Sequence, residues 1–455
     1  MAVQICFLLS WALFCSTAML VAIFLKHRKG CGKSTDRKLP PGEMGLPWIG
    51  ETADFYRSQR GNQLFEEFVQ PRVAKYGKIF KTRLLGSPTI IVNGAEANRF
   101  LLSNEFKLVI SSWPTTSVQL MGINSIMEKQ GEQHRFLREI IATSLGPAGL
   151  EILVPKICDS VQLYLDRKLE WLNFEPGTLI STFERVLEGV FAAPVSFPGS
   201  KLSRAKKARR EIKEMLIKVV REKRKEMESG LVGDERMLFT RFVSGMVRGE
   251  ISEEEVIDNV VLLVFAAHDT TSFAIAMTFK MLAEHPDCHS LLLQEHDDIM
   301  SRRRPGENLT LEDTKKMKYT WQVARESMRL FPPIFGSFRK AIADIEYEGF
   351  TIPKGWKVLW TTYGTHYNEE YFKDPLTFNP RRFEEPIPPY AYLPFGGGPR
   401  ICAGNQLAKL NILIFIHYVV TRYNWSLLCP DEQITTDPLP FPSHGMPIKV
   451  SLKSS

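Results

Sequence analysis

The sequence predicts a mainly α-helical protein with small β-sheets, preceded by an N-terminal transmembrane helix. Three features favour this class: an uncharged apolar stretch at the start, long helical patterns afterwards, and strand signals confined to short segments. With 455 residues, 44% of them apolar and 24% charged, the chain can bury a large core. We divide it into an anchor (1–25), a basic and proline-rich linker (26–50) and one large domain (51–455).

The first 25 residues carry no charged side chain. A helix needs about 20 apolar residues to cross a bilayer core, so this stretch is long enough. The alternative is a cleaved signal peptide, but no basic residue precedes the apolar run and the run is long for a signal. Positive residues follow at once, in Lys26-His27-Arg28-Lys29. Positive charge on this side predicts a single-pass anchor with the domain facing the cytosol.

The segment after the anchor is punctuated by Leu39-Pro40-Pro41-Gly42, which cannot continue a helix. It would lead the chain from the membrane into the domain. Residues 79–92 then indicate two short strands about Gly86-Ser87-Pro88. Beyond them the pattern is mostly helical.

A helix is predicted to open at Gly131, and its four-residue spacing places His134 and Arg138 on one face. Such a pair by itself is usually solvated surface. A later helix contains Glu326 and Arg329, whose spacing of three lets the charges pair. A single surface pair of this kind would contribute little to stability.

A long apolar helix is predicted from Val256 to about Leu282, capped by Ser252 with Glu255. Because it is apolar almost all round, we expect it to be buried. Asp269 and Thr270 lie in its middle, and polar groups in such a helix carry a desolvation cost. One account pairs Asp269 elsewhere and bonds the Thr270 hydroxyl back to the preceding turn. The other gives both residues a chemical role.

A single cysteine, Cys402, stands behind a glycine-rich turn at the mouth of a helix predicted over 405–420. Unpaired N–H groups and partial positive charge at a helix N-terminus favour a thiolate over a thiol. Arg400 adds a cation that could meet a carboxylate. A buried structural cysteine in a glycine-rich loop is the alternative.

The remaining composition excludes several classes of protein. No C-x-x-C pair occurs, so neither a zinc ribbon nor a disulfide framework is expected. Cys158, Cys288 and Cys429 are expected to be packing residues. The net charge of +7 is modest and the basic residues are not interleaved with aromatics, so we expect no nucleic-acid partner.

The spacing of Phe395, Gly398, Arg400, Cys402 and Gly404 resembles the haem-ligating loop of cytochromes P450. The resemblance implies the cytochrome P450 fold, haem b (iron protoporphyrin IX) as cofactor, and Cys402 as the iron ligand. The loop residues that it assigns to haem binding are Phe395, Gly398, Arg400 and Gly404. It also assigns His134 and Arg138 to one haem propionate and Arg339 to the other.

Other motifs follow in the order that the resemblance requires. The run from Ala266 to Thr271 resembles the oxygen-activation segment, which implies catalytic roles for Asp269 and Thr270. The family's structural network implies that Arg382 joins Glu326 and Arg329. Several segments resemble the plant microsomal clan that oxidises sterols, brassinosteroid precursors, triterpenes and diterpenes.

The resemblance implies a monooxygenase that inserts one oxygen atom from O2 into a hydrophobic, terpenoid or steroid substrate. Electrons would come from NADPH through NADPH-cytochrome P450 reductase, at the endoplasmic reticulum membrane. One alternative is a reductase-independent haem-thiolate isomerase or dehydratase. Another is a shortened, inactive haem-binding product, because the segment near 169–180 is short for a family that ordinarily fits further helices there.

Overall fold

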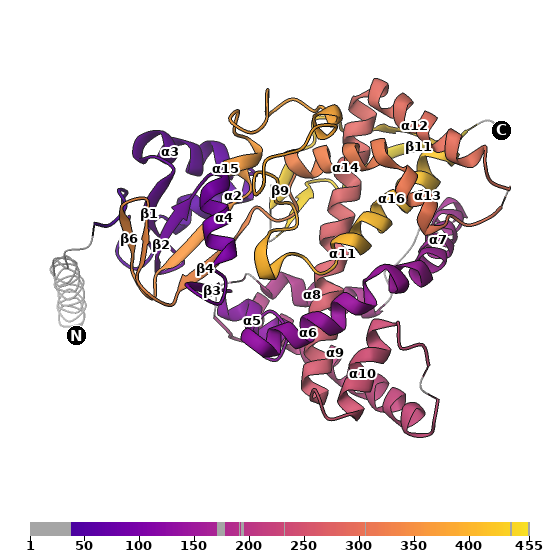
Figure 1. Cartoon of the computed structure of the whole chain (residues 1–455), viewed down its shortest axis with the longest axis horizontal. Helices are drawn as coiled ribbons and strands as arrows, with labels where there is room; N and C mark the ends of the chain where they lie inside the picture. Colours follow the sequence, from indigo (N-terminus) through magenta and orange to yellow (C-terminus); the bar gives the residue numbers. More distant parts are fainter. Residues whose placement is uncertain are drawn as a thin grey trace, which may run out of the picture.

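A small β region and a larger helical region divide the chain (Figure 1). The structure is a computed structural model and describes residues 38–170, 178–190, 192, 195–231, 233–304, 306–436 and 439–453. Most strands lie at one end of the molecule, while α11, α12, α13, α14 and α16 pack together at the other (Figure 1). The predicted mainly α fold with small β-sheets is therefore confirmed.

The strands are β1 (Ile79–Leu84), β2 (Ser87–Val92), β3 (Val109–Ser111), β4 (Gly336–Ala341), β5 (Ile345–Tyr347), β6 (Phe350–Ile352), β7 (Lys357–Thr361), β8 (Tyr423–Leu427), β9 (Ile434–Thr436), β10 (Pro440–Pro442) and β11 (Ile448–Leu452). The largest sheet has the order β1-β2-β7-β4-β3, and only β2 and β7 are parallel neighbours in it. The predicted hairpin is β1–β2. Its turn is formed by Leu85 and Gly86, both at positive φ, so it lies slightly before the expected Gly86-Ser87-Pro88.

The α-helices are α2 (Thr52–Arg60), α3 (Gln70–Tyr76), α4 (Ala95–Ser103), α5 (Thr115–Met121), α6 (Gly131–Ser144), α7 (Pro147–Glu170), α8 (Thr178–Val190), α9 (Lys201–Glu228), α10 (Leu238–Val247), α11 (Glu253–Glu284), α12 (Pro286–Met300), α13 (Leu311–Lys316), α14 (Lys318–Leu330), α15 (Tyr363–His366) and α16 (Asn405–Arg422). Short π and 3-10 turns are η1 (Leu64–Val69), η2 (Pro380–Phe383) and η3 (Gly398–Arg400). The helix expected over 405–420 is α16.

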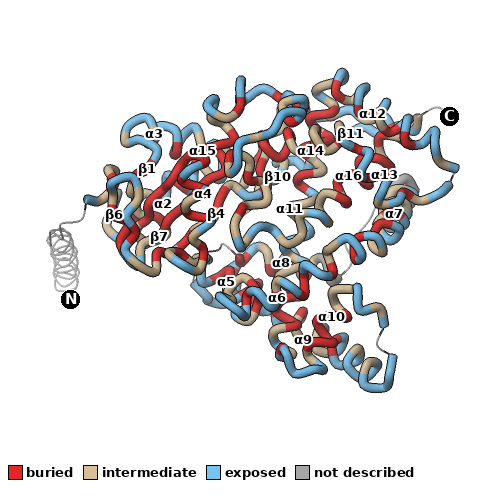
Figure 2. The backbone as a smooth tube through the Cα atoms, in the orientation of Figure 1, coloured by how far each residue is buried: buried red, intermediate tan, exposed pale blue. Residues whose placement is uncertain are grey.

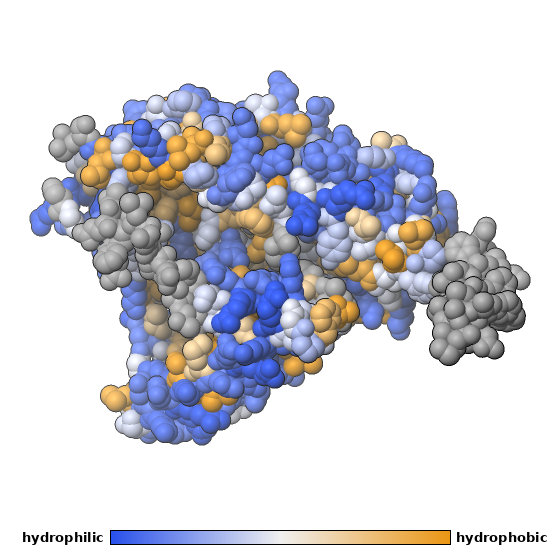
Figure 3. Space-filling model, turned by 180° about the vertical axis from the view of Figure 1, so that it is seen from behind, coloured by the Kyte–Doolittle hydropathy of each residue, from blue (hydrophilic) through white to orange (hydrophobic). Residues whose placement is uncertain are grey.

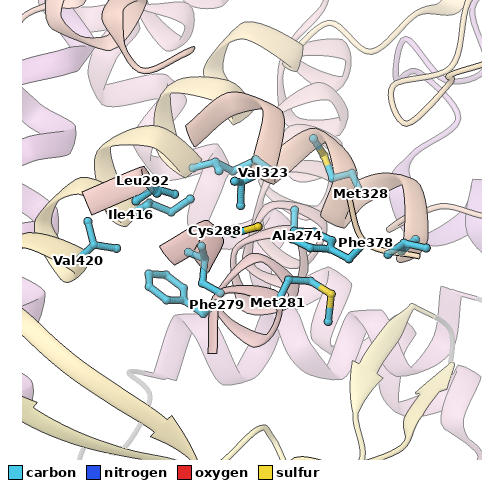
Figure 4. Packing of buried hydrophobic residues seen from close by; sticks show 14 residues of the cluster. Ala274, Phe279, Met281, Cys288, Leu292, Val323, Met328, Phe378, Ile416 and Val420 are labelled. Carbon is cyan, nitrogen blue, oxygen red and sulfur yellow. The ribbon is translucent and has the colours of Figure 1, made fainter. Parts of the chain in front are cut away.

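The core between α11, α12, α14 and α16 holds the middle and the last part of α16, the helix that follows Cys402. Figure 4 shows side chains of all four helices meeting there, with Phe378 at one side. The labelled residues are Ala274, Phe279, Met281, Cys288, Leu292, Val323, Met328, Phe378, Ile416 and Val420. Buried backbone runs through this block and through the large sheet (Figure 2). From behind, the surface is mostly hydrophilic with separate apolar patches (Figure 3).

Helix α11 begins with the predicted capping box, in which Ser252 and Glu255 bond reciprocally. Among the described residues it is the one unbroken helix long and apolar enough to cross a membrane, but its ends pack in core clusters. The prediction that it is buried along its length is wrong for the middle: Val264 is 43% exposed, and Ala266 to His268 are exposed. An apolar sequence requires an apolar partner, which need not be another part of the chain.

Several expectations concern residues at or beyond the edges of the described ranges. The anchor (1–25) and the first part of the linker (26–50) lie outside them and stay predictions. The described part of the linker contains no helix and lies along β1, where the Lys81 N–H donates to the Pro41 carbonyl at 2.8 Å. Residues 171–177 of the segment expected to be short also lie outside.

The cysteines outside the glycine-rich loop do not all behave as expected. Cys158 and Cys288 are buried, as packing residues should be. Cys429 is exposed, so the prediction that it packs in the interior is wrong. It follows β8 on a surface loop, where no apolar neighbour is needed.

Candidate functional site

The loop before α16 holds Cys402 by backbone bonds at both of its polar backbone groups. The Cys402 N–H donates to the Phe395 carbonyl at 2.9 Å, which closes the loop. The Cys402 carbonyl accepts from Asn405 Nδ2 at 3.0 Å. The cysteine is exposed, although protein atoms crowd its sulfur enough to raise the pKa of the thiol. The residue is therefore reachable by a ligand, while burial of its sulfur disfavours the charged form.

Glycine is required at position 398 for two reasons. Its φ is +66°, which disfavours other residues, and a Cβ there would stand 2.2 Å from the Leu102 carbonyl oxygen at the end of α4. The glycine-rich loop therefore packs directly on the backbone of α4. Gly404 differs, because an added Cβ would lie at an ordinary 3.9 Å from the Cys402 sulfur.

The sequence predicts a thiolate at Cys402, but the surrounding protein by itself favours the neutral thiol. Burial raises the pKa of the thiol, and this outweighs the lowering by the Gly404 N–H and by Arg138. The sequence argument considered the helix N-terminus and left out desolvation, which disfavours the charged form. A metal ion at the sulfur would reverse the balance.

Arg400 is held by carbonyl groups and by one carboxylate. Its Nε donates to Glu105 Oε1 at 2.7 Å, and its terminal nitrogens donate to the carbonyls of Ile126, Met127 and Lys129. The expectation that Arg400 could meet a carboxylate holds within the chain itself. The spacing of the cysteine loop did not indicate that Glu105 is this carboxylate.

Arg339, on β4, reaches the same carboxylate. Its Nε lies 2.7 Å from Glu105 Oε2, while Nη1 donates to Ser337 Oγ and to the Phe338 carbonyl. No described residue accepts a hydrogen bond from its Nη2. Glu105 is a site residue that the sequence did not reveal, since it belongs to no motif and lies 295 positions from Arg400.

His134 and Arg138 lie on one face of α6, as predicted, and both approach the cysteine loop. Arg138 Nη1 donates to the Ile401 carbonyl, and its charge lowers the pKa of Cys402. His134 is buried beside the Phe106 ring. Burial, with the charges of Arg400 and Arg138, lowers its pKa to about 4, so it is neutral at physiological pH.

The exposed turn of α11 carries the other predicted residues, and we call Ala266–Thr270 the open turn. The Thr270 hydroxyl donates to the Ala266 carbonyl at 2.7 Å, and Asp269 Oδ1 lies 2.6 Å from His268 Nδ1. Both bonds are those expected if Asp269 and Thr270 have only a structural role, with Asp269 paired and Thr270 bonded to the preceding turn. One turn earlier, α11 packs in the same cluster as Ala403, beside the cysteine.

Glu326, Arg329 and Arg382 meet in the interior, with side chains no more than 9% exposed. Both Glu326 oxygens accept from Arg329, and Oε1 also accepts from Arg382 Nε at 2.8 Å. Arg329 further donates to the His366 carbonyl at 2.7 Å.

His366 joins this network to the cysteine loop. The Leu393 N–H donates to His366 Nε2 at 3.0 Å, so the ring proton lies on Nδ1, which faces the Arg329 carbonyl. Leu393 is two residues before Phe395, where the loop closes. We call Glu326, Arg329, Arg382 and His366 the brace. The sequence gave no signal for His366, because its partners are backbone groups of distant segments.

The arrangement can hold an acidic ligand beside a sulfur. Three guanidinium groups, those of Arg138, Arg339 and Arg400, lie around the loop together with the buried carboxylate of Glu105. The Glu128 carboxyl lies within the field of Arg400, and burial raises its pKa. Positive charge is therefore in excess.

Comparison with known proteins identifies this arrangement. The family model described as Cytochrome P450 matches residues 178–451, more than half of the chain. A retinoic acid-bound cyanobacterial cytochrome P450 has a TM-score of 0.82 and 29% identity, covering 92% of this chain and 100% of its own. The chain belongs to the cytochrome P450 family and is a P450 monooxygenase.

Among the curated relatives are plant hydroxylases and a monooxygenase. Taxane 13-alpha-hydroxylase of Taxus cuspidata is 36% identical over 97% of each chain. Taxoid 2-alpha-hydroxylase of Taxus canadensis is 38% identical over 92% of this chain and 91% of its own. Beta-amyrin 28-monooxygenase of Barbarea vulgaris is 34% identical over 96% and 98%. The chain thus resembles plant P450s, as the motifs implied.

The residues around Cys402 fit haem b, the family's cofactor. Cys402 is exposed, and the excess cations match the carboxylates that haem carries. The open turn presents Ala266 and Ala267, whose small side chains leave room on the α11 side. Haem b is the cofactor of this chain, and NADPH through a reductase is the usual electron source in the family.

Proposed function

We propose that this chain is an endoplasmic reticulum P450 monooxygenase that adds one oxygen atom to a terpenoid or steroid. The observation that carries the proposal is the exposed Cys402, in a loop that the brace contacts at Leu393 and that arginines approach. Relatives named for taxanes, taxoids and beta-amyrin support a terpenoid substrate. Segments that we expect to line the substrate pocket are 111–121, 260–271, 334–337 and 444–447.

In this proposal Cys402 ligates the iron, and Arg138, Arg339, Arg400 and His134 hold the haem carboxylates. Phe395, Gly398 and Gly404 shape the loop around the ligand. Bound haem supplies oxygen activation, and the thiolate's electron density favours O–O cleavage. Glu326, Arg329 and Arg382 keep the loop in place without touching haem.

The open turn would manage protons. Asp269 is partly exposed and pairs with His268, so it can exchange protons with solvent and with that ring. The Thr270 hydroxyl donates to Ala266, which leaves its oxygen lone pairs free to accept from a water on the exposed side. We propose that Thr270 holds that water by a hydrogen bond and that Asp269 donates a proton to the water.

For the partner and location we propose NADPH-cytochrome P450 reductase and a single-pass anchor with the haem domain in the cytosol. Leu46, Trp48 and Ile49 support the location, since they are between 51% and 66% exposed and lie near the end of the linker. Exposed apolar side chains beside an anchor suit a bilayer surface.

The test is the reduced carbon monoxide difference spectrum of the full chain in microsomes. We expect the red-shifted Soret band of a thiolate-ligated haem. Cys402→Ala should abolish this band and NADPH-dependent oxygenation alike. Cys429→Ala, which removes another exposed cysteine, should keep both. A Cys402→Ala protein with the wild-type band would contradict the assignment.

A second candidate is a shortened P450 that binds haem without turnover. The alignment with taxane 13-alpha-hydroxylase is 477 residues long although it takes in 97% of a 455-residue chain. A few tens of positions of the alignment therefore have no counterpart here. This candidate would be favoured by a red-shifted Soret band without any oxygenated taxane or beta-amyrin product in the presence of reductase and NADPH. Product formation without NADPH or reductase would favour the isomerase alternative.

A further inference from the structure

Glu105 is the one buried carboxylate that contacts two of the arginines beside the cysteine loop in the described residues. Its side chain is 1% exposed and stands between Arg339 on β4 and Arg400 in η3. Oε1 accepts from Arg400 Nε and from the Ser111 N–H at 3.0 Å. Oε2 lies 2.7 Å from Arg339 Nε, but the N–H is not directed at it. One carboxylate thus fixes the separation of two cations.

The backbone is strained at Phe106, which follows Glu105 and whose ring also contacts Arg400. Phe106 has φ +68°, a left-handed conformation that bulky residues rarely adopt. Its ring centroid lies 4.9 Å from the Arg400 guanidinium carbon and 5.1 Å from the His134 ring. Two successive side chains therefore face the same arginine. Strain of this kind persists where the surroundings enforce it, and it clusters at functional sites.

Arg339 and Arg400 differ in how many of their terminal N–H groups are hydrogen-bonded within the protein. Carbonyls of residues 126, 127 and 129 occupy the terminal nitrogens of Arg400. In Arg339, Nη1 is bonded to Ser337 and Phe338, while Nη2 has no acceptor among the described residues. Arg339 thus keeps donor capacity for an external carboxylate.

We propose that Glu105 is a positioning residue for haem, which orients Arg339 toward a propionate and limits the repulsion between Arg339 and Arg400. This inference depends on the proposed haem-thiolate function. Without the carboxylate, Arg339 and Arg400 would be two buried cations without a counter-ion, and the guanidinium groups would separate. The propionates would then meet misplaced donors.

The test measures how fast the full-chain holoenzyme loses its haem to excess apomyoglobin. It compares haemin with haemin dimethyl ester, in which both propionate charges are removed. We expect Glu105→Gln to accelerate loss of haemin by about tenfold or more, the usual range for residues behind a metal site's direct contacts. Loss of the dimethyl ester should not change. Glu312→Gln, which removes an exposed carboxylate paired with Lys315, is the matched control.

Glu105→Asp keeps the charge but withdraws it by one methylene, so it covers the case in which the glutamine variant fails to fold. We expect intermediate acceleration for haemin and none for the ester. Equal acceleration for both haems would mean a merely structural role and would overturn the proposal, as would wild-type rates in the aspartate variant. If the wild-type chain shows no thiolate-ligated haem, the proposed function itself fails.

Discussion

The brace and the open turn, the two polar groups that we connect with the cysteine loop, are built in opposite ways. In the brace, Glu326 and Arg329 are fully buried, and each makes several charge-assisted hydrogen bonds. The open turn is exposed, and its polar side chains bond only within the turn. The group that must hold a sulfur in place is fixed by protein contacts. The group that must admit reactants is left accessible.

Breaking the brace should have the largest effect on stability. Glu326→Ala leaves Arg329 buried without its carboxylate, so we expect the free energy of unfolding to fall by about 3–5 kcal/mol. Urea unfolding of the full chain in detergent measures this change. Glu312→Ala, which breaks an exposed pair, should have little effect. Similar losses for both variants would show that the brace is no stronger than a surface pair.

Changing the open turn should affect turnover and not stability. Thr270→Val removes the hydroxyl proposed to order water, and we expect product formation per electron consumed to fall about a hundredfold. Thr278→Val is the matched control, because Thr278 makes the same backward bond, to Ala274, at a buried position of α11. It should lower stability and leave turnover unchanged. The reverse result would contradict the division of roles.

Acid should weaken the brace through His366. Burial lowers its pKa to about 3 in the folded protein, below the value of about 6.5 in an unfolded chain. Stability from the neutral ring is therefore complete above pH 6.5 and is lost as the pH falls toward 3. The loss is about 1 kcal/mol per pH unit.

The variant His366→Gln keeps an acceptor for the Leu393 N–H but cannot titrate. Urea unfolding between pH 6.5 and 5 should therefore show a shallower dependence on pH than in the wild type. Parallel slopes for the two proteins would mean that His366 is not the group that titrates.

The cap of α11 should have the smallest effect. Ser252→Ala removes the side chain that accepts from the Glu255 N–H, with an expected loss of about 1 kcal/mol. Hydrogen exchange should be faster in the first turn of α11 and unchanged at the open turn. Faster exchange at both places would mean that the two ends of the helix are coupled.

Local sequence was enough to predict much of the fold and part of the site. The capping box of α11, the helix after Cys402 and the hairpin near Gly86 depend on neighbours in sequence, which a pattern reports directly. The spacing of the cysteine loop also indicated the family. Gly398 belongs to that spacing because a Cβ there would clash with the Leu102 carbonyl oxygen. The charged network followed from a resemblance, since Arg382 is 56 positions from Glu326.

The sequence by itself predicted which residues would carry the chemistry: one cysteine in its loop, an acid and a threonine on an apolar helix, and the charges of Glu326, Arg329 and Arg382. Only the tertiary structure decided how their surroundings act on them. It placed Glu105 between two arginines, linked His366 to Leu393, and raised the pKa of Cys402 by burial. Desolvation and ion pairing depend on which distant segments pack together, and no local pattern carries that information.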